Sequence, residues 1–210
     1  MQIPADTQFI YIHGFNSSPH SFKAQQTLAL FREQGAEDQL SIPPLSHFPA
    51  EAMTQLRALV ESAQRAVLIG SSLGGFYSTW LTEHYAQARA VLVNPAVAPH
   101  KLLEGRLGFT ENYHTGERYE LTQRHVDQLR ELYLPKVMHP ERLLLLQQEE
   151  DETLDYRDAV GYYKASAQIV QPGGSHAFDD FEQMLPLIID FAAGQIDTAR
   201  LTNKPAGLGD

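Results

Sequence analysis

The segment Gly70-Ser71-Ser72-Leu73-Gly74 constrains the fold more than any other part of this sequence. It follows the apolar run Ala66-Val67-Leu68-Ile69 and precedes a stretch with helical character from about Gly75. A Gly-x-Ser-x-Gly motif between a strand and a helix predicts a sharp turn with a strained central serine, and the flanking glycines keep side chains out of the corner. We therefore expect the Ser72 hydroxyl to lie at the top of a sheet, beside a helix N-terminus that favours developing negative charge.

Short apolar runs alternate with helix-like stretches along most of the chain. This order is typical of a parallel sheet of about six strands with helices on both faces. The expected strands are 9–12, 39–42, 67–69, 90–93, 143–146 and 168–171. The expected helices are 18–34, with Ser18-Pro19 as its N-cap and first residue, 52–63, 75–87, 122–134, 156–166 and 178–193, where Pro186 marks a kink or a helix start.

The alternation stops between residues 96 and 140, where no clear strand is visible. This stretch is too long for an ordinary connection, so we interpret it as a small cap inserted above the site. Its aromatic residues either shape a substrate pocket or form the core of the cap itself; they are Phe109, Tyr113, Tyr119 and Tyr133. Residues 1–194 are expected to form a single domain, and 195–210 a tail.

A catalytic serine needs a base within hydrogen-bond reach, and the base needs an acid that orients it. In the α/β-hydrolase arrangement, serine comes first along the chain, then the acid, then histidine. The candidate base is His176, because it follows the last expected strand in the glycine-rich loop 172–178. His13 is expected to support the loop after the first strand instead.

Asp151 is the candidate acid, since it follows the strand at 143–146 in a loop that faces the histidine loop. Asp155 and Glu150 are competitors, although Asp155 is also well placed as the N-cap of a helix that starts at Tyr156. The acidic run lacks the alternating ligands of a Ca²⁺ loop, and the chain has no His-Glu-x-x-His motif. No metal and no organic cofactor are therefore expected.

Two backbone N–H groups are needed to bind the oxyanion of a tetrahedral intermediate. One is expected from Leu73, directly after the nucleophile, and the other from Phe15 in the loop after the first strand, with Asn16 as second choice. The same loop lacks the G-x-x-x-x-G-K-S/T spacing of a phosphate-binding loop.

Five blocks in this order resemble the YqiA-type esterases, which are small bacterial α/β-hydrolases. The blocks are His13-Gly14-Phe15-Asn16-Ser17-Ser18-Pro19, Gly70-Ser71-Ser72-Leu73-Gly74-Gly75, Val93-Asn94-Pro95-Ala96-Val97, Asp151-Glu152-Thr153-Leu154-Asp155-Tyr156-Arg157 and Gly174-Ser175-His176-Ala177-Phe178. The resemblance covers about residues 9–191. It implies the α/β-hydrolase fold, esterase or thioesterase activity on acyl substrates, and Ser72, Asp151 and His176 as the triad.

The composition of the chain restricts the kinds of partner that it could bind. The net charge of −10 argues against a nucleic-acid surface, and the absence of cysteine excludes disulfides and thiolate metal sites. Residues 1–6 resemble no secretory signal and no apolar span is visible, so we expect a cytoplasmic protein without a membrane span. The expected partner is a small acyl ester or thioester. Alternatives are an acyltransferase or peptidase on the same scaffold, a non-catalytic binding protein with this fold, or an interaction protein with chance motifs.

Overall fold

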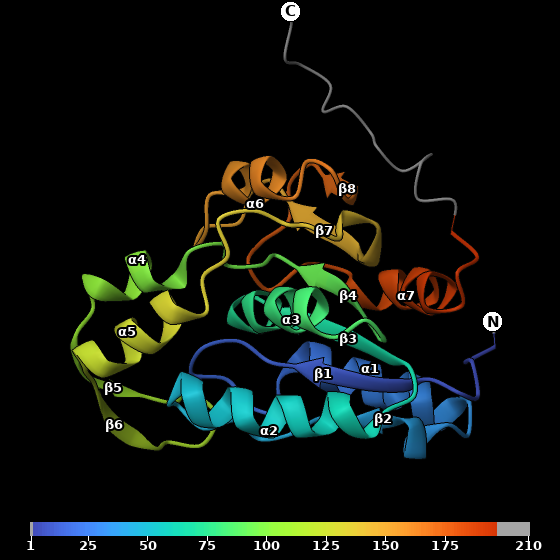
Figure 1. Cartoon of the computed structure of the whole chain (residues 1–210), viewed down its shortest axis with the longest axis horizontal. Coiled ribbons are helices and arrows are strands. Elements are labelled where there is room, and N and C mark those ends of the chain that lie inside the picture. The colour runs from blue at the N-terminus through green and yellow to red at the C-terminus, as the bar shows by residue number, and fades with distance from the viewer. Residues whose placement is uncertain (1, 197–210) are drawn as a thin grey trace, which may run out of the picture.

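A six-stranded parallel sheet lies at the centre of the protein, whose computed structural model describes residues 2–196 (Figure 1). Its strand order is β2-β1-β3-β4-β7-β8. The strands are β1 (Gln8–Ile12), β2 (Leu40–Ser41), β3 (Ala66–Ser71), β4 (Ala88–Val93), β7 (Leu143–Gln148) and β8 (Ala167–Gln171). Each expected strand forms, and each end lies within two residues of its predicted position.

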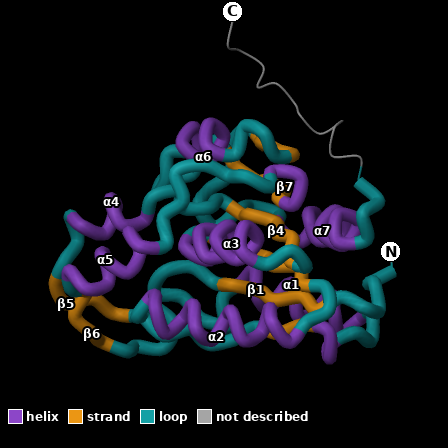
Figure 2. Tube along the Cα trace, viewed as in Figure 1, coloured by secondary structure: helices purple, strands orange, loops and turns teal. Residues whose placement is uncertain are grey.

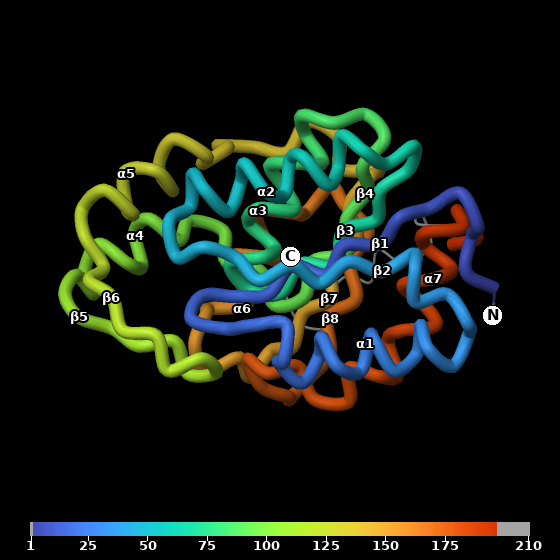
Figure 3. The backbone as a smooth tube through the Cα atoms, turned by 90° about the horizontal axis from the view of Figure 1, so that it is seen from below, coloured from blue at the N-terminus to red at the C-terminus, as the bar shows by residue number. Residues whose placement is uncertain are grey.

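Helices cover both faces of this sheet, as expected. On one face lie α1 (Phe22–Glu33) and α7 (Leu185–Ala192), and on the other α2 (Pro49–Ser62), α3 (Leu73–His84) and α6 (Tyr156–Tyr162). Figure 3 shows α2 and α3 on one side of β1 and β3, with α1 on the opposite side. Short 3₁₀ turns occur at Glu37–Gln39, Pro140–Arg142 and Phe181–Met184. Among residues 2–196, the helices lack the length and the hydrophobicity that a membrane span requires.

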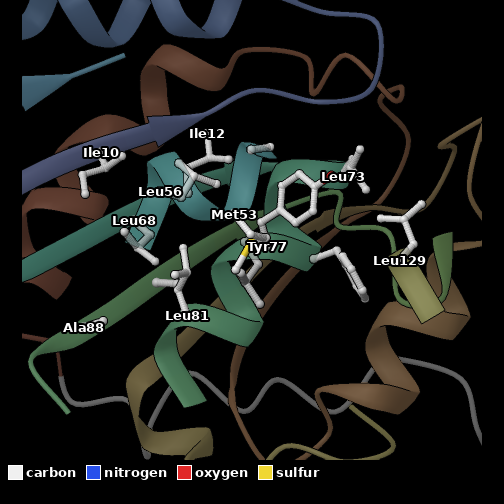
Figure 4. Packing of buried hydrophobic residues seen from close by; sticks show 14 of the residues in the cluster. Ile10, Ile12, Met53, Leu56, Leu68, Leu73, Tyr77, Leu81, Ala88 and Leu129 are labelled. Atoms are coloured by element: carbon white, nitrogen blue, oxygen red, sulfur yellow. The ribbon is translucent and has the colours of Figure 1, made fainter. Parts of the chain in front are cut away.

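Alternating side chains of the central strands divide the core into two clusters, because successive strand residues point to opposite faces. In β1, Phe9 and Tyr11 pack with the α1 and α7 side, whereas Ile10 and Ile12 pack with the α2 and α3 side. Figure 4 shows this second cluster, in which the β1 isoleucines lie near Leu56 of α2. Both faces are apolar, which explains why the strands read as nearly continuous hydrophobic runs.

The sequence predicted the start of α7 better than the start of α1. The first helix begins at Phe22, with Ser21 at the N-cap position, and not at Ser18-Pro19. The Ser18 hydroxyl accepts from the N–H of His20 at 3.1 Å and its carbonyl accepts from Ser21, so these residues form a turn instead. Pro186 lies in the first turn of α7, which settles its role as a helix start.

The segment between β4 and β7 contains two strands, so the expectation that it lacks strands was wrong. It forms α4 (Pro99–Glu104), β5 (Gly108–Glu111), β6 (Arg118–Leu121) and α5 (Gln123–Glu131), gathered at one end of the molecule (Figures 1 and 2). We call residues 96–140 the insertion. β5 and β6 pair as an antiparallel hairpin.

The aromatic residues of the insertion lie in different environments. Phe109 and Tyr113 are exposed, at 89% and 84%, whereas Tyr119 is buried. Tyr119 joins Leu129 of α5 in the core cluster that contains α2 and α3. The insertion is therefore packed against the sheet domain through its inner side chains. Of the tail expected at 195–210, residues 197–210 lie outside the part of the chain that the structure describes.

Gly74 is expected to be essential for stability, because the start of α3 passes directly over the end of β1. A Cβ atom at Gly74 would lie 1.9 Å from the carbonyl oxygen of Ile12. We expect Gly74→Ala to lower the free energy of unfolding by about 3 kcal/mol, measured by urea denaturation. The control is Gly161→Ala in α6, where a Cβ would meet nothing within 4 Å. That change should stabilise the protein by up to about 1 kcal/mol; equal stabilities of the two variants would contradict the prediction.

Candidate active site

Ser72 forms the whole turn between a strand and a helix. β3 ends at Ser71 and α3 begins at Leu73, and Ser72 itself has φ 54° and ψ −117°. This left-handed conformation costs a non-glycine residue about 1–3 kcal/mol and persists only where surrounding contacts fix it. Here the Ser72 N–H donates to the carbonyl of Val93 at 3.0 Å, and its carbonyl accepts from Ala96 at 3.0 Å. The expected strained turn is present, anchored to the neighbouring strand β4.

The loop after β1 lies directly against Ser72. A Cβ atom on Gly14 would be 3.1 Å from the Ser72 Cβ and 3.6 Å from its Oγ, so a larger residue here would crowd Ser72. Phe15 and Leu73 line the same pocket as Ser72. Among the described residues, neither the Phe15 N–H nor the Leu73 N–H has a hydrogen-bond acceptor. Two unused donors therefore flank the serine, at the positions expected for an oxyanion hole.

His176 and Asp151 form a close pair on the loops that follow β8 and β7. The His176 Nδ1 lies 2.8 Å from Asp151 Oδ2 and 3.0 Å from Oδ1. The Asp151 side chain is fully buried, and its Oδ1 also accepts from the N–H groups of Thr153 and Leu154, at 2.9 and 2.8 Å. These contacts place the Nδ1 proton toward the carboxylate and leave the His176 Nε2 as the acceptor.

Ser72 and His176 are not hydrogen-bonded to each other. Within residues 2–196, the His176 ring forms hydrogen bonds to Asp151 alone. Asn94 nevertheless connects their surroundings, since it follows Val93, the partner of the Ser72 N–H. The Asn94 Nδ2 donates to the carbonyls of Ser175 at 2.8 Å and His176 at 3.3 Å. Nucleophile–base contacts of this kind often tighten only when substrate binds.

The two competitors for the acid have other contacts. Asp155 caps α6 by accepting from the Arg157 N–H, and it pairs with the Arg157 guanidinium at 2.7 Å. The hydrogen bond from the Arg157 side chain lowers the pKa of Asp155. Glu150 is exposed, and its N–H donates to the carbonyl of Gly173. Of the three carboxylates, Asp151 is the one that contacts the His176 ring.

Several residues that hold the histidine loop were not found from the sequence. Gln148 Oε1 accepts from the N–H groups of Ser175 and Asp179, at 3.1 and 2.8 Å, and Asn94 Oδ1 accepts from the Gln148 N–H at 2.9 Å. Glu152 Oε2 accepts from the His176 N–H at 2.9 Å, and this bond lowers the Glu152 pKa. The sequence did contain a signal for these residues, because they are polar and lie at or directly after the ends of buried strands. Such positions meet at one edge of a parallel sheet.

Lys23 reaches the same loop from α1. Its ammonium donates to the carbonyl of Ala177 at 2.6 Å. Burial lowers the pKa of Lys23 to about 8, while the nearby Asp151 carboxylate opposes that shift. A cation therefore lies close to the Asp151–His176 pair, on the side of α1.

His13 is buried and supports the loop after β1, as expected from its position at the end of that strand. Its Nδ1 lies 3.0 Å from the carbonyl oxygen of Gly14. Burial lowers the pKa of His13, which favours the neutral ring. A neutral ring with its proton on Nδ1 donates to the Gly14 carbonyl and so holds the loop in place.

Ser72 opens into a pocket with mostly apolar walls. Its other lining residues are Phe15, Leu73, Ala96, Pro99, Leu102, Leu103, Arg106, Thr153 and Leu154. Within residues 2–196, no three histidine, aspartate or glutamate side chains gather in a way that could hold a metal ion. A strained serine and two free N–H donors lie at this apolar pocket, and the carboxylate-bound histidine lies on the loop after β8, at the same edge of the sheet. Such a set suits nucleophilic attack on an acyl carbon.

Comparison with known proteins shows which family this chain matches and which solved structures share its fold. Residues 8–193 match the Uncharacterised protein family (UPF0227). The mouse α/β-hydrolase domain-containing protein 10 is 14% identical, with a TM-score of 0.67 over 95% of this chain and 92% of its own. Est1E from Butyrivibrio proteoclasticus, solved with ferulic acid bound, is 15% identical, with a TM-score of 0.65 over 90% and 89% of the two chains.

A third solved structure has the same architecture. The esterase domain of a Rhodothermus marinus protein is 17% identical, with a TM-score of 0.60 over 92% of this chain and 89% of its own. At such low identities, the similarities establish the fold and leave the reaction open. They confirm the expected α/β-hydrolase fold.

Proposed function

The chain belongs to the Uncharacterised protein family (UPF0227), and for this member we propose hydrolysis of carboxylic esters or thioesters by a Ser72–His176–Asp151 triad. The observation that carries the proposal is the strained Ser72 turn at the same sheet edge as His176, whose ring is hydrogen-bonded to the buried Asp151 carboxylate. A turn of this kind costs free energy and has no structural need for serine, so a serine there that lines a pocket favours a nucleophile.

The proposed reaction has two stages. The Ser72 Oγ attacks the acyl carbon while the His176 Nε2 takes its proton, and the Asp151 carboxylate stabilises the resulting imidazolium. The N–H groups of Phe15 and Leu73 bind the oxyanion, and His176 then protonates the departing alcohol or thiol. Water, activated by His176, releases the acid from the acyl-enzyme. Each N–H donor is expected to contribute about 3–4 kcal/mol, as measured for such donors elsewhere.

The apolar pocket supports acyl substrates. Pro99, Leu102 and Leu103 of α4 form one wall beside Ser72, and Leu154 contributes from the Asp151 loop. The insertion thus acts as a cap in this proposal, because α4 belongs to it and covers the pocket. Apolar walls with a few polar groups at one end match an acyl chain joined to a reactive carbonyl.

A fluorophosphonate probe tests the proposal directly, because it phosphonylates a serine only when the hydroxyl is activated. We expect one probe molecule per chain, located by peptide mass spectrometry on Ser72. A p-nitrophenyl butyrate substrate should slow the labelling in proportion to its occupancy of the site. Denatured protein serves as the control and should remain unlabelled. Absence of label on Ser72, or equal labelling of other serines, would count against a serine hydrolase.

A further inference from the structure

The oxyanion loop is held by the β5–β6 hairpin of the insertion. The Tyr119 hydroxyl donates to Asn16 Oδ1 at 2.6 Å, and the Asn16 Nδ2 donates to the Thr110 Oγ1 at 2.9 Å. The Asn16 carbonyl accepts from the N–H of Tyr113 at 3.2 Å. Thus three contacts to one hairpin hold the residue that directly follows Phe15. Asn112 adds a fourth contact nearby, since its Nδ2 donates to the carbonyl of Ser17 at 2.9 Å.

Asn16 needs such support because of its backbone. Its φ is 52°, and it is only 7% exposed, so a strained residue is buried directly after Phe15, which lines the same pocket as Ser72. Asparagine is among the residues that adopt this conformation most readily, but it does so where neighbouring contacts fix it. Both ends of its side-chain amide are occupied by the hairpin. The hairpin therefore determines where the chain turns directly after the expected oxyanion donor.

We propose that Tyr119, acting through Asn16, is a positioning residue that sets the direction of the Phe15 N–H toward the oxyanion. This inference rests on the proposed function, and it assigns a part of the catalytic apparatus to the insertion. The Gly14–Phe15 peptide is held from one side by the His13 ring on the Gly14 carbonyl. Because the N–H of a trans peptide points opposite its C=O, that contact aims the Phe15 N–H away from His13. The Asn16 contacts fix the same segment from its other end.

Tyr119 is itself rigidly placed. Its ring stacks on His47 with centroids 4.1 Å apart and an angle of 15° between the planes. The His47 Nδ1 lies 2.9 Å from the Nε2 of His125, near the start of α5. Burial raises the pKa of Tyr119 to about 12, so its hydroxyl keeps its proton at any working pH. A rigid, protonated donor is what holding the Asn16 amide requires.

The Tyr119→Phe variant tests the inference, because it keeps the ring and its stacking and removes only the hydroxyl. We expect kcat for p-nitrophenyl butyrate to fall about tenfold, with KM within about twofold, since a misplaced donor weakens mainly the transition state. Phenylboronic acid, which forms a tetrahedral adduct with an active serine, should bind about tenfold more weakly. A purely structural role would lower the unfolding midpoint without this matched loss of kcat and boronate affinity.

Variants on the same hairpin complete the test. Tyr113→Phe is the matched control, because its side chain is exposed and only its backbone contacts the loop; it should behave as wild type. Thr110→Val should show part of the same loss of kcat and boronate affinity. Thr110→Ser should have the wild-type values, since serine keeps the hydroxyl. Wild-type kcat and boronate affinity in Tyr119→Phe would overturn the inference. If wild-type protein binds the boronate no better than Ser72→Ala does, the proposed function itself fails, and this inference with it.

Discussion

Replacing Ser72 by alanine is expected to reduce kcat for a p-nitrophenyl ester by at least about 10⁴-fold. Without the Oγ, no acyl-enzyme can form, and His176 has no proton to accept from the nucleophile. The residual rate would come from the oxyanion donors and from binding alone, as it does when a triad member is removed. Steady-state hydrolysis at several ester concentrations measures the effect, and KM should change much less than kcat.

The neighbouring Ser71→Ala variant is the matched control for this prediction. Ser71 is the last residue of β3, it is buried, and it directly precedes Ser72 in the chain. Removal of the same atom should leave kcat within about threefold of wild type, because Ser71 does not face the pocket that Ser72 lines. The Ser72→Ala variant should also keep its unfolding midpoint, because alanine and serine share the backbone cost at φ 54°. Turnover that survives in Ser72→Ala would show that the activity comes from elsewhere.

The sequence was most informative where the pattern is local. The strand before Ser72 and the helix after it lie within twenty residues of the turn, so their residue types alone predicted the strained serine. The sequence predicts Asp151 and His176 as partners because each follows a buried strand, and the ends of parallel strands meet at one edge of the sheet. The structure brings these two side chains within hydrogen-bond distance. This prediction required only the order of strands and helices along the chain, and no knowledge of side-chain contacts.

The parts that sequence reasoning missed depend on distant pairings. The β5–β6 hairpin has only four residues in each strand, and Arg118–Leu121 alternates outward and inward for too short a run to stand out. The Tyr119–Asn16 bond joins residues 103 positions apart, and the Asn94–Ser175 bond joins residues 81 apart. Such contacts form only when the chain has folded, which is why neither the hairpin nor the support of the loops after β1 and β8 could be predicted from the spacing of residues.

Asp151→Asn is the second change expected to have a very large effect, with kcat falling about 10³–10⁴-fold. Within residues 2–196, the Asp151 carboxylate has three hydrogen-bond partners, and all are donors, namely the N–H groups of Thr153 and Leu154 and the His176 Nδ1. With an asparagine side chain, the single oxygen would be taken by the two backbone donors, which leaves the NH₂ group facing the ring. His176 would then carry its proton on Nε2 and could no longer accept the Ser72 proton.

The Asp155→Asn variant makes this prediction specific to one carboxylate. Both changes remove one negative charge from the same loop, so a general electrostatic effect would appear in both variants. The Asp155→Asn side chain can still cap α6, and the exposed pair with Arg157 contributes little to stability, so activity should stay within about twofold of wild type. Equal losses in the two variants would point to the loop charge, and a larger loss in Asp155→Asn would transfer the acid's role to that residue. Only a loss confined to Asp151→Asn is consistent with a carboxylate that fixes the histidine tautomer.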